Sequence, residues 1–228
     1  MGTRHLVLVY YNGAYHIAQY GQFDGYPAGS GAQILRFISD PAKVAKLKAV
    51  LSNADAMLYT PTEEQCQQLD PEIHPSMSIS TGGAILETVA NATEPVPIIK
   101  EMWFLADQVS CEWVYCVDLD DGVLEVYSGS NGTPVKDQYE SRFEGLVDWK
   151  EVRKWVDGLH EMIGLPRMIG RFPFAQLPDE DGFINALPDG DGILNALDDE
   201  DDSVNALDDE DGSINALDDE DGSINALE

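Results

Sequence analysis

The chain has 228 residues and a formal net charge of −29. Residues 177–228 hold 19 of the 42 acidic residues and no Lys or Arg, which leaves a net charge of −10 on residues 1–176. Such acidity argues against direct nucleic-acid binding, because the phosphate backbone would be repelled. The length and the change in composition predict one globular domain over 1–176 and an appendage over 177–228.

Three cysteines without a CxxC spacing form neither a disulfide framework nor a zinc site. We expect Cys66, Cys111 and Cys116 to be free thiols in a reducing compartment. The first residues lack the apolar region and cleavage site of a signal peptide, and no run is long enough to span a membrane. These features predict a cytoplasmic or nuclear protein that is not secreted and has no membrane partner.

A β-hairpin near the N-terminus is the strongest local signal. Asn12-Gly13 separates two runs of apolar and β-branched residues, which is typical of a type I′ turn. The turn predicts the cross-strand pairs Tyr11–Ala14, Tyr10–Tyr15, Val9–His16, Leu8–Ile17 and Val7–Ala18. Both faces of this hairpin are largely apolar, so we expect it at the centre of a sheet that is covered on both sides.

Further elements follow in chain order. Residues 21–31 contain four glycines and a proline and predict a loop. Apolar periodicity, caps and prolines predict helices within 32–40, 41–52, 60–70, 84–93 and 144–163, with a short strand at 58–59. A second hairpin is expected over 111–129, turning at Asp120-Asp121-Gly122, then a loop over 128–137 and an extended segment over 167–177. The fold class is therefore α+β, with a hairpin-built antiparallel sheet covered by helices.

From Leu177 a ten-residue unit repeats, and its last two full copies read LDDEDGSINA. The Asp-x-Asp-Gly-x-Ile-Asn part is similar to the middle of an EF-hand or dockerin loop, which makes calcium candidates of Asp209, Asp211, Asp219 and Asp221. The match fails at the first and twelfth positions of such a loop, which fall on Leu207 and Asp218. We therefore expect a disordered acidic tail that offers short motifs to a protein partner, with calcium binding as the alternative.

Polar groups that could carry chemistry gather at the open end of the first hairpin and in the loop that follows. The candidate ligand-binding residues are Thr3, Arg4, His5, Asp24, Tyr26, Gly29, Ser30 and Gly31. Bare glycine amides before a helix favour an anionic or polar ligand, although P-loop and GxGxxG spacings are absent. The simpler alternative is that the glycines serve only a tight strand-to-helix turn. No cofactor is predicted, and the body shows no metal-ligand pattern.

The opening segment also carries a resemblance. Thr3-Arg4, the hairpin, the run QYGQFDGYP at 19–27, Gly29, Gly31 and the following AQILRFISDP resemble a family of uncharacterised proteins of filamentous fungi and, more distantly, of bacteria and phages. The resemblance extends to about residue 176 and includes CEWVYCVDLD. Phe23 stands where that family commonly has Trp, and the decapeptide tail lies outside the resemblance. The family implies no activity.

Three functions remain open from the sequence, and whether the protein is an enzyme is undecided. The first is an intracellular binding protein that holds a small polar or anionic ligand at loop 21–31 and the helix start. The second is an amide hydrolase of N-terminal-nucleophile-like architecture, using Thr3 or Asp24 with His5 or His16. The third is a protein-interaction module that acts through the acidic repeats.

Overall fold

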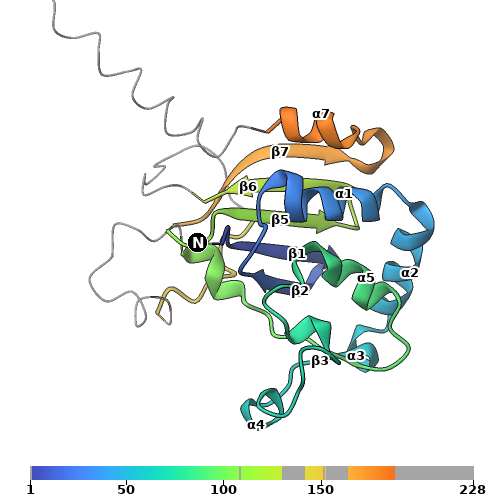
Figure 1. Ribbon diagram of the computed structural model, residues 1–228, viewed down its shortest axis with the longest axis vertical. Helices are drawn as coiled ribbons and strands as arrows, with labels where there is room; N and C mark the ends of the chain where they lie inside the picture. The colour runs from blue at the N-terminus through green and yellow to red at the C-terminus, as the bar shows by residue number, and fades with distance from the viewer. Residues whose placement is uncertain (1, 108, 130–141, 151, 153–163, 188–228) are drawn as a thin grey trace, which may run out of the picture. The chain divides into compact units, whose positions relative to one another are not determined.

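One mixed sheet of five strands forms the centre of the body (Figure 1). The structure, a computed structural model, describes residues 2–107, 109–129, 142–150, 152 and 164–187. In sheet order the strands are β2 (Ala14–Gly21), β1 (His5–Tyr11), β5 (Trp113–Asp118), β6 (Val123–Ser128) and β7 (Arg167–Pro173). β1 and β5 run parallel, whereas the other neighbouring strands are antiparallel. The α+β class is confirmed, but the sheet is mixed and not purely antiparallel as expected.

The parallel pair requires a long crossover, and the crossover supplies most of the helices. Between β2 and β5 lie α1 (Ala32–Ile38), α2 (Pro41–Leu51), α3 (Ala54–Met57), α4 (Glu63–Cys66) and α5 (Ile85–Ala90), with the short paired strands β3 (Leu58–Tyr59) and β4 (Val96–Pro97). Local signals explain the helix starts. The Asp40 side chain caps the amide of Ala42, and Thr62 forms a capping box with Gln65. The helices and the strand predicted within 32–93 are thus confirmed.

The first hairpin turns where expected, but a β-bulge shifts its register. Tyr11 pairs with Ala14 and Tyr10 with Tyr15, as predicted, whereas Val9 pairs with Ile17. His16 is therefore an extra residue in β2. The predicted pairs Val9–His16, Leu8–Ile17 and Val7–Ala18 are wrong. Because the bulge shifts the register by one residue, each β2 side chain beyond it lies on the face opposite to the predicted one.

Both faces of the sheet are covered, as expected. On one face Val7, Val9 and Ile17 pack in a core cluster with the apolar sides of α1, α2 and α5. On the other, Leu6, Leu8 and Ala18 pack with residues 104–106 and with Phe143, Val147 and Val152. The hairpin is nevertheless not central, because β5 is the middle strand and β2 lies at an edge.

The first decapeptide unit belongs to the body. It forms α7 (Glu180–Asn185), where the Asp179 side chain accepts a hydrogen bond from the amide of Gly182. Phe183 and Leu187 are buried in the same core cluster as α1. The body therefore continues past residue 176, where the sequence placed its end, to Leu187. In this unit the Asp-rich segment starts a helix.

Several expectations fall on residues that the structure does not describe. They are the calcium candidates, the disorder of the remaining repeats over 188–228, and most of the loop over 128–137 and the helix within 144–163. Within the described ranges, no helix is long and apolar enough to cross a membrane. All three cysteines are free, as predicted, and Cys111 and Cys116 are buried.

Candidate functional site

The loop that was expected to bind a ligand folds around the side chain of His5. This histidine is fully buried, and its Nε2 lies 2.9 Å from Oγ of Ser30, which is also buried. Burial lowers the pKa of His5 to about 4, so the imidazole is neutral near pH 7. A histidine in this position is a component of the core.

Three glycines leave the space that the imidazole fills. A Cβ atom on Gly21 would lie 2.1 Å from the His5 ring, and one on Gly25 would lie 2.7 Å from it. A Cβ on Gly82 would lie 2.6 Å from Oγ of Ser30, and Gly82 also has a positive φ of 50°. The glycines of the loop therefore allow the backbone to close tightly on His5 and Ser30.

The loop amides are engaged within the protein. Gly25 N–H donates to the carbonyl of Thr3 (3.0 Å), Gly29 N–H to Tyr26 (2.9 Å) and Ser30 N–H to Asp24 (2.7 Å). The Tyr115 hydroxyl donates to the Gly25 carbonyl (2.7 Å). An anion at this loop would have to bind through groups other than these three amides.

The remaining predicted site residues divide between the interior and the surface. Thr3 and Arg4 are half-buried. Gly31 is buried, and a Cβ atom at its position would lie 3.0 Å from the Tyr115 ring. Asp24 and Tyr26 are exposed and joined by a hydrogen bond of 3.2 Å.

His16 lies at the bulge, at the other end of the hairpin from His5, and its Nε2 contacts the carbonyl of Tyr11 at 3.0 Å. The structure does not bring the two histidines together.

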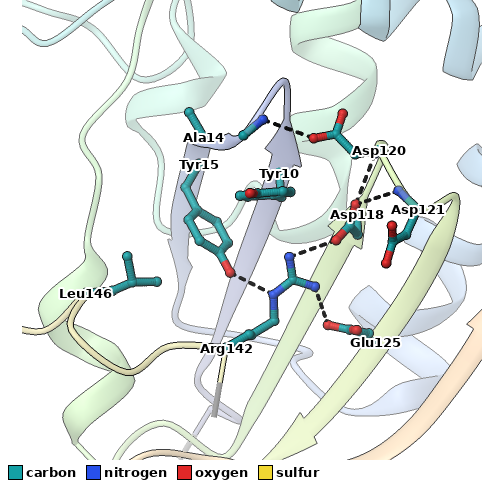
Figure 2. A pocket seen from close by; sticks show the side chains of 10 residues that line it. Tyr10, Ala14, Tyr15, Asp118, Asp120, Asp121, Glu125, Arg142 and Leu146 are labelled. Carbon is teal, nitrogen blue, oxygen red and sulfur yellow. Dashed lines mark hydrogen bonds and ion pairs between the residues drawn. The ribbon is translucent and has the colours of Figure 1, made fainter. Parts of the chain in front are cut away.

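A cavity of about 660 Å³ opens at the opposite end of the sheet (Figure 2). It lies between the β1–β2 turn, the β5–β6 turn and the segment that follows residue 141. Its charged and aromatic lining consists of Tyr10, Tyr15, Asp118, Asp120, Asp121, Glu125 and Arg142. We call this the carboxylate cavity.

The guanidinium of Arg142 forms the wall at the deep end of the carboxylate cavity, beside the buried Asp118 and Glu125. Its Nη2 donates to Asp118 (2.8 Å), its Nη1 to Glu125, and its Nε to the Tyr15 hydroxyl (2.8 Å). Its central carbon lies over the rings of Tyr10 and Tyr15, 5.0 and 5.7 Å from the centroids. Two carboxylates and two aromatic faces thus enclose one cation, an arrangement that strongly favours positive charge.

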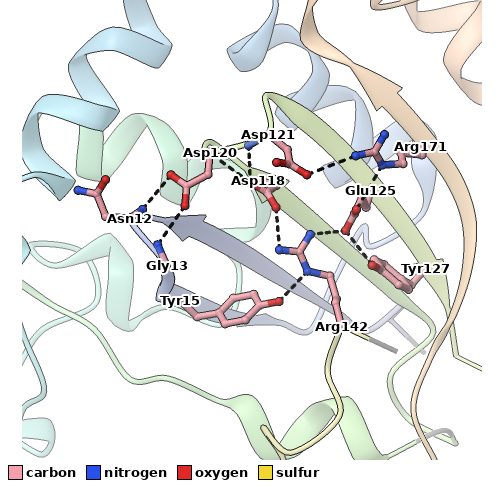
Figure 3. A network of polar contacts seen from close by, with 10 residues as sticks. All are labelled: Asn12, Gly13, Tyr15, Asp118, Asp120, Asp121, Glu125, Tyr127, Arg142 and Arg171. Carbon is pink, nitrogen blue, oxygen red and sulfur yellow. Dashed lines mark hydrogen bonds and ion pairs between the residues drawn. The ribbon is translucent and has the colours of Figure 1, made fainter. Parts of the chain in front are cut away.

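Other groups hold the carboxylates of the cavity in place (Figure 3). Oδ1 of Asp118 accepts the amides of Asp120 (3.0 Å) and Asp121 (2.9 Å). Glu125 accepts the Tyr127 hydroxyl at 2.8 Å.

Asp120 reaches across to the other hairpin. It accepts the amides of Gly13 and Asn12, and these bonds lower the pKa of its carboxyl group. The turns of the two hairpins are thereby joined at the mouth of the cavity.

Negative charge exceeds positive charge in this region. The lining has four carboxylates and one guanidinium. Arg171 adds a second cation at 3.5 Å from Asp121 and Glu125, and the charge of Lys48 acts on Asp120, which leaves a formal excess of one negative charge. Burial raises the pKa of the Tyr15 hydroxyl, so that group stays neutral and can both donate and accept a hydrogen bond.

The sequence reading did not identify this region. One signal was available, because Asp118 and Glu125 interrupt otherwise apolar strands and are buried in the structure. Nothing in the sequence places Arg142 beside them.

No known protein family matches the chain, and no curated protein or solved structure matches it either. In the part of the chain that the structure describes, no group of three or more His, Cys, Asp or Glu side chains could hold a metal ion.

Proposed function

We propose that the protein binds a small cationic ligand in the carboxylate cavity. One observation carries the proposal: the wall of the cavity already binds a cation between two carboxylates and two tyrosine rings, and its surroundings keep a formal excess of one negative charge. Low-dielectric walls strengthen the attraction between such carboxylates and a ligand cation.

The geometry supports a ligand of modest size. A volume of about 660 Å³ lies within the range of small-molecule pockets, and its polar groups converge from three separate segments of the chain. Asp121 has a side chain that is 68% exposed and therefore meets an entering ligand at the mouth. Asp118 and Glu125 lie deeper, with side chains only 6% and 8% exposed.

A small anionic ligand at loop 21–31 is less well supported than the cation. The amides of Gly25, Gly29 and Ser30 are used by backbone carbonyls, and His5 is buried and neutral. A hydrolase is also less well supported, because the hydroxyl–histidine contact at this loop, between Ser30 and His5, is buried and closed to a substrate.

A thermal-shift screen with three groups of compounds tests the proposal. Alkylamines and guanidinium compounds are expected to raise the melting temperature, whereas phosphate, nucleotides and carboxylates are not. Asp121→Asn should reduce the shift. The matched control is Glu180→Gln, because Glu180 is also an exposed carboxylate paired with an arginine, Arg36, but lies outside the cavity lining.

Stabilisation by anions alone, lost in Asp24→Ala, would replace this proposal with a ligand at loop 21–31. Cation stabilisation that both Asp121→Asn and Glu180→Gln leave unchanged would place the binding outside the cavity.

A further inference from the structure

We infer that the deep end of the carboxylate cavity is a guanidinium subsite, occupied by Arg142 in this structure, and that a ligand carrying a guanidinium group binds there by displacing Arg142. The inference rests on the proposed function and narrows it from cations in general to one chemical class. In this account Arg142 competes with the ligand for the guanidinium subsite.

The contacts of the subsite suit a planar guanidinium group with N–H donors on three nitrogens, and not the compact charge of an ammonium group. Each of the three guanidinium nitrogens of Arg142 meets a different oxygen, from Asp118, Glu125 and Tyr15. The central carbon of the group lies 5.0 Å from the centroid of the Tyr10 ring and 5.7 Å from that of Tyr15, within the range of cation–π attraction. An ammonium ion presents no plane to stack, so it would use these walls less completely.

The walls of the subsite belong to the sheet, and the occupant does not. Tyr10, Tyr15, Asp118 and Glu125 lie on β1, β2, β5 and β6, whereas Arg142 lies in a turn segment between β6 and β7 (Figure 2). Strands hold side chains more rigidly than turns do.

The two carboxylates also have partners besides Arg142. Asp118 is held by the amides of Asp120 and Asp121, and Glu125 by Tyr127 and Arg171 (Figure 3). The subsite is therefore expected to keep its shape when Arg142 leaves.

Exchange of one guanidinium for another conserves the charge balance and every hydrogen bond of the subsite. Arg142 competes as a tethered group with an effective concentration on the order of millimolar. If Arg142 fills the subsite about nine-tenths of the time, the apparent affinity for a ligand is reduced about tenfold. The Arg142 side chain is 21% exposed, so the subsite opens towards the cavity.

The test compares agmatine with putrescine, which share a four-carbon chain and a total charge and differ only in one guanidinium group. Binding of both is measured by calorimetry on the full chain and on its Arg142→Ala variant. The acidic repeats are present in both proteins, so their contribution cancels. We expect Arg142→Ala to bind agmatine at least about tenfold more tightly than the wild type does, and to prefer agmatine over putrescine by a similar factor.

An unchanged ratio of agmatine to putrescine affinity would overturn the inference. That result would leave the proposed function standing if the wild type still bound both compounds through Asp121. If Arg142→Ala does not fold, Arg142→Lys serves instead, because it keeps the charge and loses the fork. Agmatine should bind Arg142→Lys about threefold or more tightly than the wild type, and equal affinity would again contradict the inference.

Discussion

Nε2 of His5 lies 2.9 Å from Oγ of Ser30, and both side chains are buried at the open end of the first hairpin. This contact joins the start of β1 to the turn that precedes α1. Larger residues at Gly21 and Gly25 would clash with His5, which explains why the loop of residues 21–31 is rich in glycine. A neutral, buried histidine of this kind has consequences that can be measured.

The first prediction concerns acid. His5 has a pKa of about 4 in the folded protein and about 6.5 when unfolded, so the unfolded chain binds the extra proton between these values. Its contribution is fully present above pH 6.5 and is lost as the pH falls towards 4. Between pH 7.5 and pH 5 this group alone should lower the free energy of unfolding by about 2 kcal/mol.

Urea unfolding of the wild type and His5→Asn checks this prediction. The stability difference between the two proteins should shrink by about that amount at pH 5, because the variant lacks the titrating ring. A difference that is the same at both pH values would show that His5 is not held neutral.

The second prediction concerns the glycines around His5. Gly21→Ala should lower the free energy of unfolding by about 3 kcal/mol, because its Cβ would lie 2.1 Å from the His5 ring. Gly13→Ala is the matched control: Gly13 has a positive φ of 75° but nothing within 4 Å of its Cβ. It should cost only about 1 kcal/mol of backbone strain. Chemical denaturation distinguishes the two, and similar losses would contradict the packing around His5.

The third prediction concerns stability at the carboxylate cavity. Arg142→Ala should lower the free energy of unfolding by about 3 kcal/mol, because it leaves Asp118 buried without a cation and Glu125 with only Arg171, at 3.5 Å. Arg36→Ala removes an exposed pair with Glu180 and should cost at most about 1 kcal/mol. Equal effects in denaturant titrations would mean that Arg142 does not compensate buried charge.

The fourth prediction concerns the first decapeptide unit. Phe183 is fully buried against Phe172, so Phe183→Ala should lower the free energy of unfolding by about 3–4 kcal/mol. The same change at Phe23, which is 48% exposed, should cost less than about 1 kcal/mol. Thermal and urea unfolding of both variants measure the difference. A mild Phe183→Ala would show that this unit is not part of the core.

Local signals made most of the elements predictable. Asn12-Gly13 and Asp121-Gly122 locate both hairpin turns, and Pro41 and Thr62 locate two helix starts. The bulge at His16 was not predictable from the turn, because both faces of the hairpin are largely apolar and its sequence pattern therefore fits either register. The parallel pairing of β1 with β5 depends on contacts far apart in sequence, which local periodicity does not encode.

The candidate site was less predictable than the fold, for the same reason. Sequence reading favoured loop 21–31 because its glycines and polar residues are contiguous, and the structure turns several of them inward around His5. The carboxylate cavity combines Tyr15, Asp118 and Arg142, which are separated by 24 to 127 positions. Only the buried acids in apolar strands gave any sequence signal.

The measurement that tests the central claim most directly is a calorimetric titration of the protein with agmatine at low salt. It should be run on the full chain and on a chain ending at residue 187, the last described residue of the body, to separate the remaining acidic repeats from the cavity. We predict saturable binding by both chains, weakened severalfold by Asp121→Asn and not by Glu180→Gln. Binding by the full chain alone, or equal binding by the two variants, would contradict a cation site in the carboxylate cavity.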